Sequence, residues 1–384
     1  MFKIKTYKFF FDSVNVFFYN CWAIALLRAN HSLQDLAQAL GIFFLTQSVL
    51  QVPTGIFADK YSRKLSIQIG LTLTIVGAFM MALTTYTWIG FLTIGVGFTF
   101  TEGAQAAWLR EISNFEALGK SDTSFYFSLE LIGRFATVTN ALLGFFLSNK
   151  KPLYYWSFLI LLCLISLFIV NIEKDTPLPS KNNKLKFNFE SLKFSRSFIV
   201  FLFPTGIFYG LEWAIRNLNF QPYVDNFAKE ANNPWIFGYF FAILSASRML
   251  GNLTYKRLPS KVKNNFPLLL FFTLSIFGLS EIHAGYATNF WSFIAFYAGA
   301  VFFLGIFFPI RETLLNRIIP PNLRATALSL DSMVTFGVAA AFLLLFSQKG
   351  SININQLWIV SGVSLVLAGI GFAASAKISE RQKI

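Results

Sequence analysis

Apolar stretches recur along the whole chain, separated by short polar segments. Each stretch reaches the roughly 20 residues that a helix needs to cross the hydrocarbon core of a bilayer. The pattern predicts membrane helices at residues 9–27, 33–58, 65–85, 88–111, 123–147, 153–172, 197–220, 234–255, 266–284, 288–314, 324–347 and 354–376. The expected fold class is therefore an all-α integral membrane protein with twelve transmembrane helices.

Composition supports a membrane protein and excludes a water-soluble one. Of the 384 residues, 55% are hydrophobic, 13% are charged and 48 are Phe. In a soluble domain about a quarter of the residues are charged. This chain therefore has more apolar surface than a water-soluble globule could bury. Lipid-facing Phe is the commoner reason for a high Phe content, so the aromatic residues alone say little about a ligand.

The basic residues are distributed unevenly between the two sides of the predicted bundle. The net charge is +14, and 23 Lys and Arg fall in the loops of one side against five on the other. Positive residues stay on the cytoplasmic side during insertion. We therefore expect a multi-pass protein of the cytoplasmic (inner) membrane with both termini cytoplasmic, and the positive charge needs no nucleic acid partner.

Motifs for catalysis or metal binding do not occur. Cys21 and Cys163 lie in apolar stretches, and His31 and His283 are far apart in sequence, so no metal-ligand spacing arises. The chain also contains no G-x-S-x-G or H-E-x-x-H segment and no Gly-rich phosphate loop of the form G-x-x-x-x-G-K-S/T. We expect neither an enzyme nor a cofactor or metal site.

The longest polar stretch divides the chain into two halves. It covers residues 173–196 and separates six predicted helices from the other six. The expected domains are an N-terminal six-helix bundle at 1–172, a cytoplasmic linker at 173–196 and a C-terminal six-helix bundle at 197–384.

Short matches indicate that the halves are pseudo-repeats. Leu109–Glu111 (LRE) corresponds to Ile310–Glu312 (IRE) at an offset of 201 residues, and Ser128–Glu130 (SLE) corresponds to Ser329–Asp331 (SLD) at the same offset. Two matches at one offset and at equivalent helix positions favour a duplication, which is common in transporters.

The segment Gly55–Lys64, GIFADKYSRK, places four charged residues within six positions between two apolar stretches. It resembles the signature loop of the major facilitator superfamily, G-x-x-x-D-R/K-x-G-R-K/R, with Ser62 in place of the second glycine. Thr101–Ile112 and Arg324–Met333 resemble segments of bacterial drug-efflux-like members. The resemblance extends over nearly the whole chain and implies a transporter with that superfamily's fold.

The charged loop is interpreted as a gating latch. Gly55 lets its helix approach a neighbouring backbone closely. The Asp59 carboxylate suits the positive N-terminus of another helix, which stabilises it by about 0.3–1 kcal/mol; the resemblance implies that this is the eleventh helix. Arg63 can reach the carboxylate of Glu111. The alternative is an ordinary basic loop on the cytoplasmic side.

Ionisable residues within membrane helices are costly, at about 2.5–3.5 kcal/mol at a helix centre on insertion scales, and usually face a cavity or a partner. The seventh predicted helix carries one polar stripe of Thr205, Tyr209, Glu212, Arg216 and Asn219. Glu212 and Arg216 either line a substrate cavity or only neutralise each other at i, i+4.

Three helices of the first half carry similar polar groups. They are Asp12, Asn15 and Tyr19 on the first helix, Glu102 and Gln105 on the fourth, and Glu130 and Arg134 on the fifth. The resemblance implies that helices 1, 4, 7 and 10 line a central cavity. Each assignment has an alternative. Asp12 lies near a helix end and could simply reach water, and Arg134 could simply be neutralised by Glu102 or Glu130.

A buried carboxylate that can be neutralised is suited to carry a proton, because burial disfavours the charged form. Glu102, the deepest carboxylate on this interpretation, is the first candidate, followed by Glu212 and Asp12. Asp331 lies near the inner end of its helix, where we expect it to assist gating or to cap the structure.

The predicted function is secondary active transport by alternating access. The expected cargo is a small organic solute, amphipathic molecules included, moved by proton-coupled efflux, and the expected state is a monomer in the lipid bilayer. The alternative is import of a metabolite or a metal-chelating, siderophore-like molecule. A receptor or scaffold that does not transport would need neither a latch nor buried carboxylates on several helices.

Overall fold

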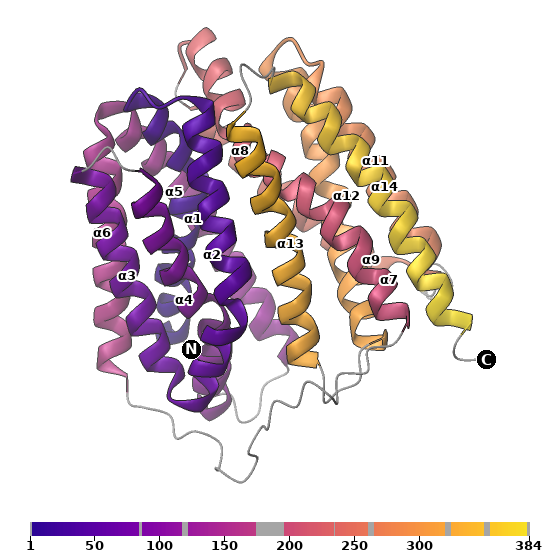
Figure 1. Ribbon diagram of the computed structural model, residues 1–384, viewed down its shortest axis with the longest axis horizontal. Coiled ribbons are helices and arrows are strands. Elements are labelled where there is room, and N and C mark those ends of the chain that lie inside the picture. Colours follow the sequence, from indigo (N-terminus) through magenta and orange to yellow (C-terminus); the bar gives the residue numbers. More distant parts are fainter. Residues whose placement is uncertain are drawn as a thin grey trace. The chain divides into compact units, whose positions relative to one another are not determined.

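The structure is a computed structural model, and its described part is helical throughout apart from short turns (Figure 1). The residues described are 2–83, 87–116, 122–173, 196–233, 235–259, 265–318, 324–348 and 354–381. The chain divides into two compact units, Met1–Lys186 and Phe187–Ile384. The predicted linker lies largely outside the described residues.

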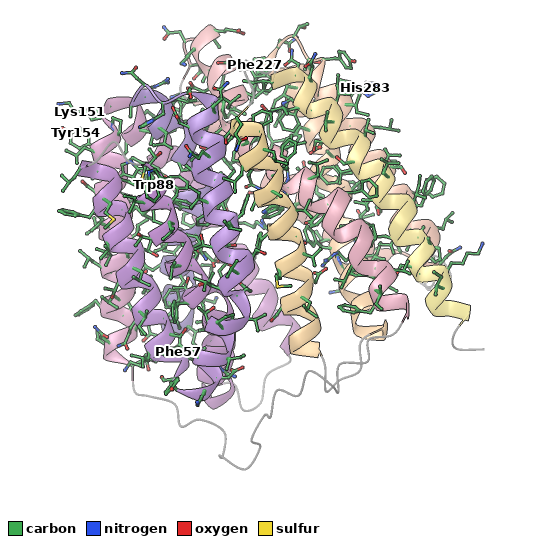
Figure 2. All side chains as sticks on the ribbon, in the orientation of Figure 1. Phe57, Trp88, Lys151, Tyr154, Phe227 and His283 are labelled. Atoms are coloured by element: carbon green, nitrogen blue, oxygen red, sulfur yellow. The ribbon has the colours of Figure 1, made fainter. Side chains whose placement is uncertain are left out.

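The first unit is a bundle of helices that cross it end to end. Its helices are α1 (Phe2–Arg28), α2 (Leu33–Lys60), α3 (Arg63–Leu83), α4 (Thr87–Glu116), α5 (Asp122–Lys150) and α6 (Pro152–Ile172). α1 packs against α5 and α6, while α4 packs against α2 and α3. Lys151 and Tyr154, at the α5–α6 connection, lie at the opposite end of the unit from Phe57 of α2 (Figure 2).

The second unit begins with one long helical path that contains a π-helical turn. α7 (Arg196–Pro204) continues through η2 (Thr205–Tyr209) into α8 (Gly210–Glu230). Pro204 lacks the N–H that a regular α-helix would use and its ring crowds the preceding turn. The wider turn therefore follows the residue that disrupts the ladder.

Five further helices complete this unit in its described part. They are α9 (Ile236–Arg257), α11 (Phe266–Gly285), α12 (Phe290–Ile318), α13 (Arg324–Ser347) and α14 (Ile354–Arg381). α11 packs against α12 and runs beside α14, α9 packs against α12, and α8 packs against α13 and α14 (Figure 1). These pairs follow the same helix order as the pairs of the first unit. The duplication itself stays a prediction.

Each apolar stretch predicted from the sequence coincides with a helix, but the number of membrane spans is not settled by this. Ten helices are long and apolar enough to cross a membrane in the described part. α4 and the α7–η2–α8 path are not among these ten. Twelve spans therefore remain a prediction, whereas the multi-helix membrane character is clear.

The seventh helix was predicted to end at residue 220, and this boundary is wrong. α8 continues to Glu230 with Pro222 inside it. The polar composition beyond residue 220 is typical of a loop, yet Gln221 and Asp225 are buried in the unit. Tertiary burial therefore extends the helix beyond its apolar stretch.

Glycines allow several helices to approach closely, though not at the position predicted. A methyl group added at Gly70 of α3 would lie 2.5 Å from the carbonyl oxygen of Gly97 in α4, and one added at Gly278 of α11 would lie 2.3 Å from that of Gly362 in α14. Small residues permit such contacts in membrane helices. At Gly55 a methyl group would meet no atom of the described residues within 4 Å, so the close approach predicted there is not found in this part of the structure.

Candidate functional site

Glu102 lies near the middle of the 30-residue helix α4 and is half-buried. The protein acts on its carboxyl group mainly by removing it from water, and no neighbouring charge among the described residues acts on it. The alternative pairing of Glu102 with Arg134 is therefore not found in the described part. The side chain of Glu130, the other partner considered for Arg134, lies outside the described residues.

Polar side chains of α1 and α2 surround this carboxylate. The Tyr19 hydroxyl lies close to both Glu102 and Gln47. Gln47 is fully buried, and neither amide atom has a hydrogen-bond partner of good geometry among the described residues; the same holds for Oε1 of Gln51 one turn further along. Neither glutamine was predicted from the sequence, although their i, i+4 spacing within an apolar helix was a usable signal.

Aromatic rings enclose the same region of the first unit. Phe18 lies 5.2 Å from Phe43 and 5.1 Å from Phe98 between ring centroids, and Tyr19 packs edge-on against Phe43. All three Phe rings are buried. Part of the high Phe content therefore forms an interior wall beside the polar cluster rather than lipid-facing surface.

One turn along α4, Gln105 is also buried. The neighbouring Trp108 is fully buried, stacks with Tyr7 at 5.9 Å and meets Phe11 edge-on at 5.8 Å. Its indole Nε1 has no hydrogen-bond partner among the described residues.

Asp12 has two cationic neighbours. Its Oδ1 accepts a hydrogen bond from Lys8 Nζ at 2.6 Å, and the charge of Arg134 on α5 also acts on it. Gly133 provides the space for the carboxylate, since a methyl group there would lie 2.7 Å from Oδ2. Asn15 is half-buried one turn above. The two cations favour the ionised form of Asp12, whereas no cation among the described residues acts on Glu102.

In the second unit, Glu212 and Arg216 of α8 form the predicted pair. Arg216 Nε donates to Glu212 Oε1 at 2.5 Å, and the Arg216 guanidinium lies 4.7 Å from the ring centre of Trp213. Glu212 is completely buried, and its Oε2 has no partner among the described residues. Both the neutralising and the ligand-binding interpretations remain compatible with this geometry.

A second buried carboxylate, Glu281 of α11, lies near this pair and was not predicted. Its Oε2 accepts a hydrogen bond from Ser361 Oγ at 2.6 Å. The charges of Glu212 and Arg216 act on it. It is the sole acidic residue of the 20-residue α11, so an isolated acid in an apolar stretch was the signal that could have identified it.

Asp331 of α13 forms a buried ion pair with Arg311 of α12. The Arg311 guanidinium also lies 5.8 Å from the ring centre of Tyr209, which is buried. Tyr209 thus lies between this pair and the Glu212–Arg216 pair, since charges of both act on it. The gating role assigned to Asp331 stays a prediction.

The charged loop contains an exposed ion pair. Arg63 Nη2, at the start of α3, donates to Asp59 Oδ1, at the end of α2, at 3.2 Å, and the Asp59 side chain is 56% exposed. The neighbouring Lys64 Nζ donates to the carbonyl oxygen of Glu173. The side chain of Glu111, the predicted partner of Arg63, lies outside the described residues, so the latch also stays a prediction.

The chain belongs to the Major Facilitator Superfamily, whose sequence model matches residues 9–342. It is accordingly a multi-pass membrane transporter of a small-molecule solute. A search of curated protein sequences finds no significant match.

Solved structures agree with this fold. Two crystal structures of the nucleoside transporter NupG, one of them a point mutant, are similar with TM-scores of 0.73 and 0.77. Each is 16% identical in sequence and covers 97% of this chain, with 98% and 99% of the NupG chains covered. At this identity the likeness establishes the fold.

Proposed function

We propose that this transporter couples the movement of a small organic solute to protons by alternating access, with Glu102 as the proton carrier. The observation that supports this most is the mid-helix position of Glu102 without a cationic partner among the described residues. An ionisable group costs about 2.5–3.5 kcal/mol at the centre of a membrane helix on insertion scales. A carboxyl group that accepts and releases a proton explains why such a residue is present.

The cluster around Glu102 supports a solute with both polar and ring-like parts. The amide of Gln47 supplies hydrogen-bonding atoms for which no hydrogen bond of good geometry is found in the described region, beside the Tyr19 hydroxyl that also lies close to Glu102. Buried polar groups normally have partners, so a bound solute or water is the natural complement. The rings of Phe18 and Phe98 offer an apolar wall for the remainder of the solute.

A nucleoside-like solute is a second candidate within the same class. It combines a planar base, which suits the aromatic wall, with hydroxyl and amide-like groups, which suit the glutamine side chains. The similar NupG structures are those of a nucleoside transporter. This candidate favours import, whereas the resemblance to drug-efflux-like members favours export of an amphipathic solute.

The loop Gly55–Lys64 is proposed to control opening on the cytoplasmic side. The exposed Asp59–Arg63 pair supports this, since it can exchange partners at low cost: exposed ion pairs contribute only about 0.2–1 kcal/mol. We further propose a monomer in the cytoplasmic membrane with both termini inside, on the distribution of Lys and Arg.

Purified protein in liposomes under an imposed pH gradient tests the proposal. The panel contains labelled nucleosides and labelled aromatic amphiphiles, with the gradient set in each direction and empty liposomes as the control. We expect one class to accumulate against its gradient and to lose that accumulation when a protonophore is added. Accumulation that is indifferent to the pH gradient contradicts proton coupling, and no flux of any member favours a receptor or scaffold.

A further inference from the structure

Glu281 of α11 is a buried acid, and among the described residues one of its two carboxylate oxygens has no hydrogen-bond donor. It is 0% exposed. Ser361 of α14 donates to Oε2 at 2.6 Å, but Oε1 has no hydrogen-bond partner among the described residues. A buried carboxylate oxygen without a donor is costly.

The charged and titratable groups that face Glu281 come from two other helices. α8 contributes Glu212 and Arg216, and α12 contributes Tyr297, whose hydroxyl lies against the Arg216 guanidinium. α14 contributes the Ser361 hydroxyl, which does not titrate in the physiological range. The charge of Arg216 therefore acts on two carboxylates, one of which it also bonds directly.

Charge balance decides the protonation of this cluster. With Glu212 and Glu281 both ionised, the buried cluster has one excess negative charge, and an uncompensated buried charge is strongly unfavourable. Arg216 donates a charge-assisted hydrogen bond to Glu212 at 2.5 Å, which favours the ionised form of Glu212 over that of Glu281. A proton on Oε1 of Glu281 neutralises the cluster and leaves Oε2 as the carbonyl oxygen that Ser361 already donates to.

The cluster also contains the donor that an ionised Glu281 would need. Nη2 of Arg216 is buried and has no partner among the described residues. When Glu281 loses its proton, this N–H can form a charge-assisted hydrogen bond to it. The π-helical turn η2 lies three residues before Glu212, and such turns interrupt the regular hydrogen-bond ladder, often at functional sites. At this turn the start of α8 can therefore change its backbone conformation.

We propose that Glu281 is a second proton-binding site of this transporter, and that Arg216 bonds Glu212 alone when Glu281 is protonated but bridges both carboxylates when it is ionised. Protonation takes one proton from water onto Oε1, and deprotonation returns it. The proposal rests on the proposed proton-coupled transport for its role in the cycle, while the site itself is tested without a solute.

Infrared difference spectroscopy of the purified protein in lipid vesicles, between acidic and alkaline buffer, detects protonated carboxyl groups by their carbonyl band. We expect a band in the wild type that is missing from Glu281→Gln. We also expect Glu212→Gln to lose this band at neutral pH, because Arg216 is then free to hold Glu281 as a carboxylate. A spectrum of Glu281→Gln with the full wild-type signal, or Glu212→Gln with the band unchanged, overturns the proposal.

Two controls separate this site from its surroundings. Ser361→Ala keeps the acid but removes the hydrogen bond to Oε2, so the band should move to higher frequency; an unmoved band contradicts the site even if Glu281→Gln folds poorly. Glu102→Gln should keep the Glu281 band. If Glu102→Gln loses driven transport but keeps this band, the two proton sites are separate. If Glu102→Gln transports as the wild type does, the result contradicts only the proposed coupling role of Glu102.

Discussion

Arg311 of α12 and Asp331 of α13 form a buried ion pair that joins two helices of the second unit. Each side chain is less than a tenth exposed, so neither charge is screened by water. The Arg311 guanidinium also lies 5.3 Å from the ring centre of Phe201. The pair therefore fixes α12 and α13 to each other beside α7, the helix that contains Phe201.

Removing one charge of this pair should destabilise the protein strongly. Asp331→Asn leaves the guanidinium in a buried place without its counter-charge, which costs about 3–5 kcal/mol in comparable cases. Thermal unfolding of the purified protein measures the loss. Arg311→Gln combined with Asp331→Asn removes both charges and should recover much of it; a double variant no more stable than Asp331→Asn contradicts a direct pair energy.

Glu102→Gln should abolish accumulation driven by a pH gradient while exchange of solute down its own gradient continues. The amide resembles a permanently protonated carboxyl group, so the site still binds but no longer exchanges a proton. Counterflow and driven uptake in the same vesicles measure the two activities. Glu102→Asp keeps an ionisable group and should retain part of the coupling. Arg134→Gln should not rescue Glu102→Gln, and rescue would restore the structural interpretation of Glu102.

Gln47→Met should weaken solute binding without harming the fold. The buried amide lies beside the Tyr19 hydroxyl but has no hydrogen bond of good geometry among the described residues, and an unsatisfied buried polar group costs about 1–3 kcal/mol. An apolar side chain of similar volume should therefore leave the melting temperature equal or higher while the KM for transport rises. A large fall in melting temperature would show instead that Gln47 holds the helices together.

Asp59→Asn should reduce transport sharply at nearly normal stability. The Asp59–Arg63 pair is exposed and contributes only about 0.2–1 kcal/mol, so a fall in transport reflects gating. Lys60→Gln, a charge change at the adjacent exposed residue, serves as the matched control. If Asp59→Asn and Arg63→Ala together transport as the wild type does, the loop is an ordinary basic turn.

Topology can be tested by cysteine labelling in intact cells. The native Cys21 and Cys163 are buried, so they should give little background with an impermeant thiol reagent. A cysteine in place of Lys150 should be labelled from outside, whereas cysteines in place of Lys184 or Lys261 should be protected until the cells are opened. Labelling of the last two from outside would invert the orientation and move the charged loop to the external side.

The helices could be predicted from the sequence because their signal is local. Each apolar stretch must satisfy its own backbone hydrogen bonds in lipid, and only a helix does so within one segment. The stretch predicted at residues 153–172 thus appears as Pro152–Ile172. The main error was the end of α8, where burial of Gln221 and Asp225 overrides their polar character.

The partners of the ionisable groups could be predicted only where they share a helix. Glu212 and Arg216 are four residues apart, so helical geometry alone brings them together. Glu281 and Ser361 are 80 residues apart, and Tyr19 meets Glu102 and Gln47 from three different helices. Which faces of α1, α2, α4, α8 and α11 turn toward one another depends on side-chain packing summed over whole helices. The sequence therefore determined that costly polar groups lie within the membrane helices, and tertiary packing decided which of them are paired and which remain open to a solute or a proton.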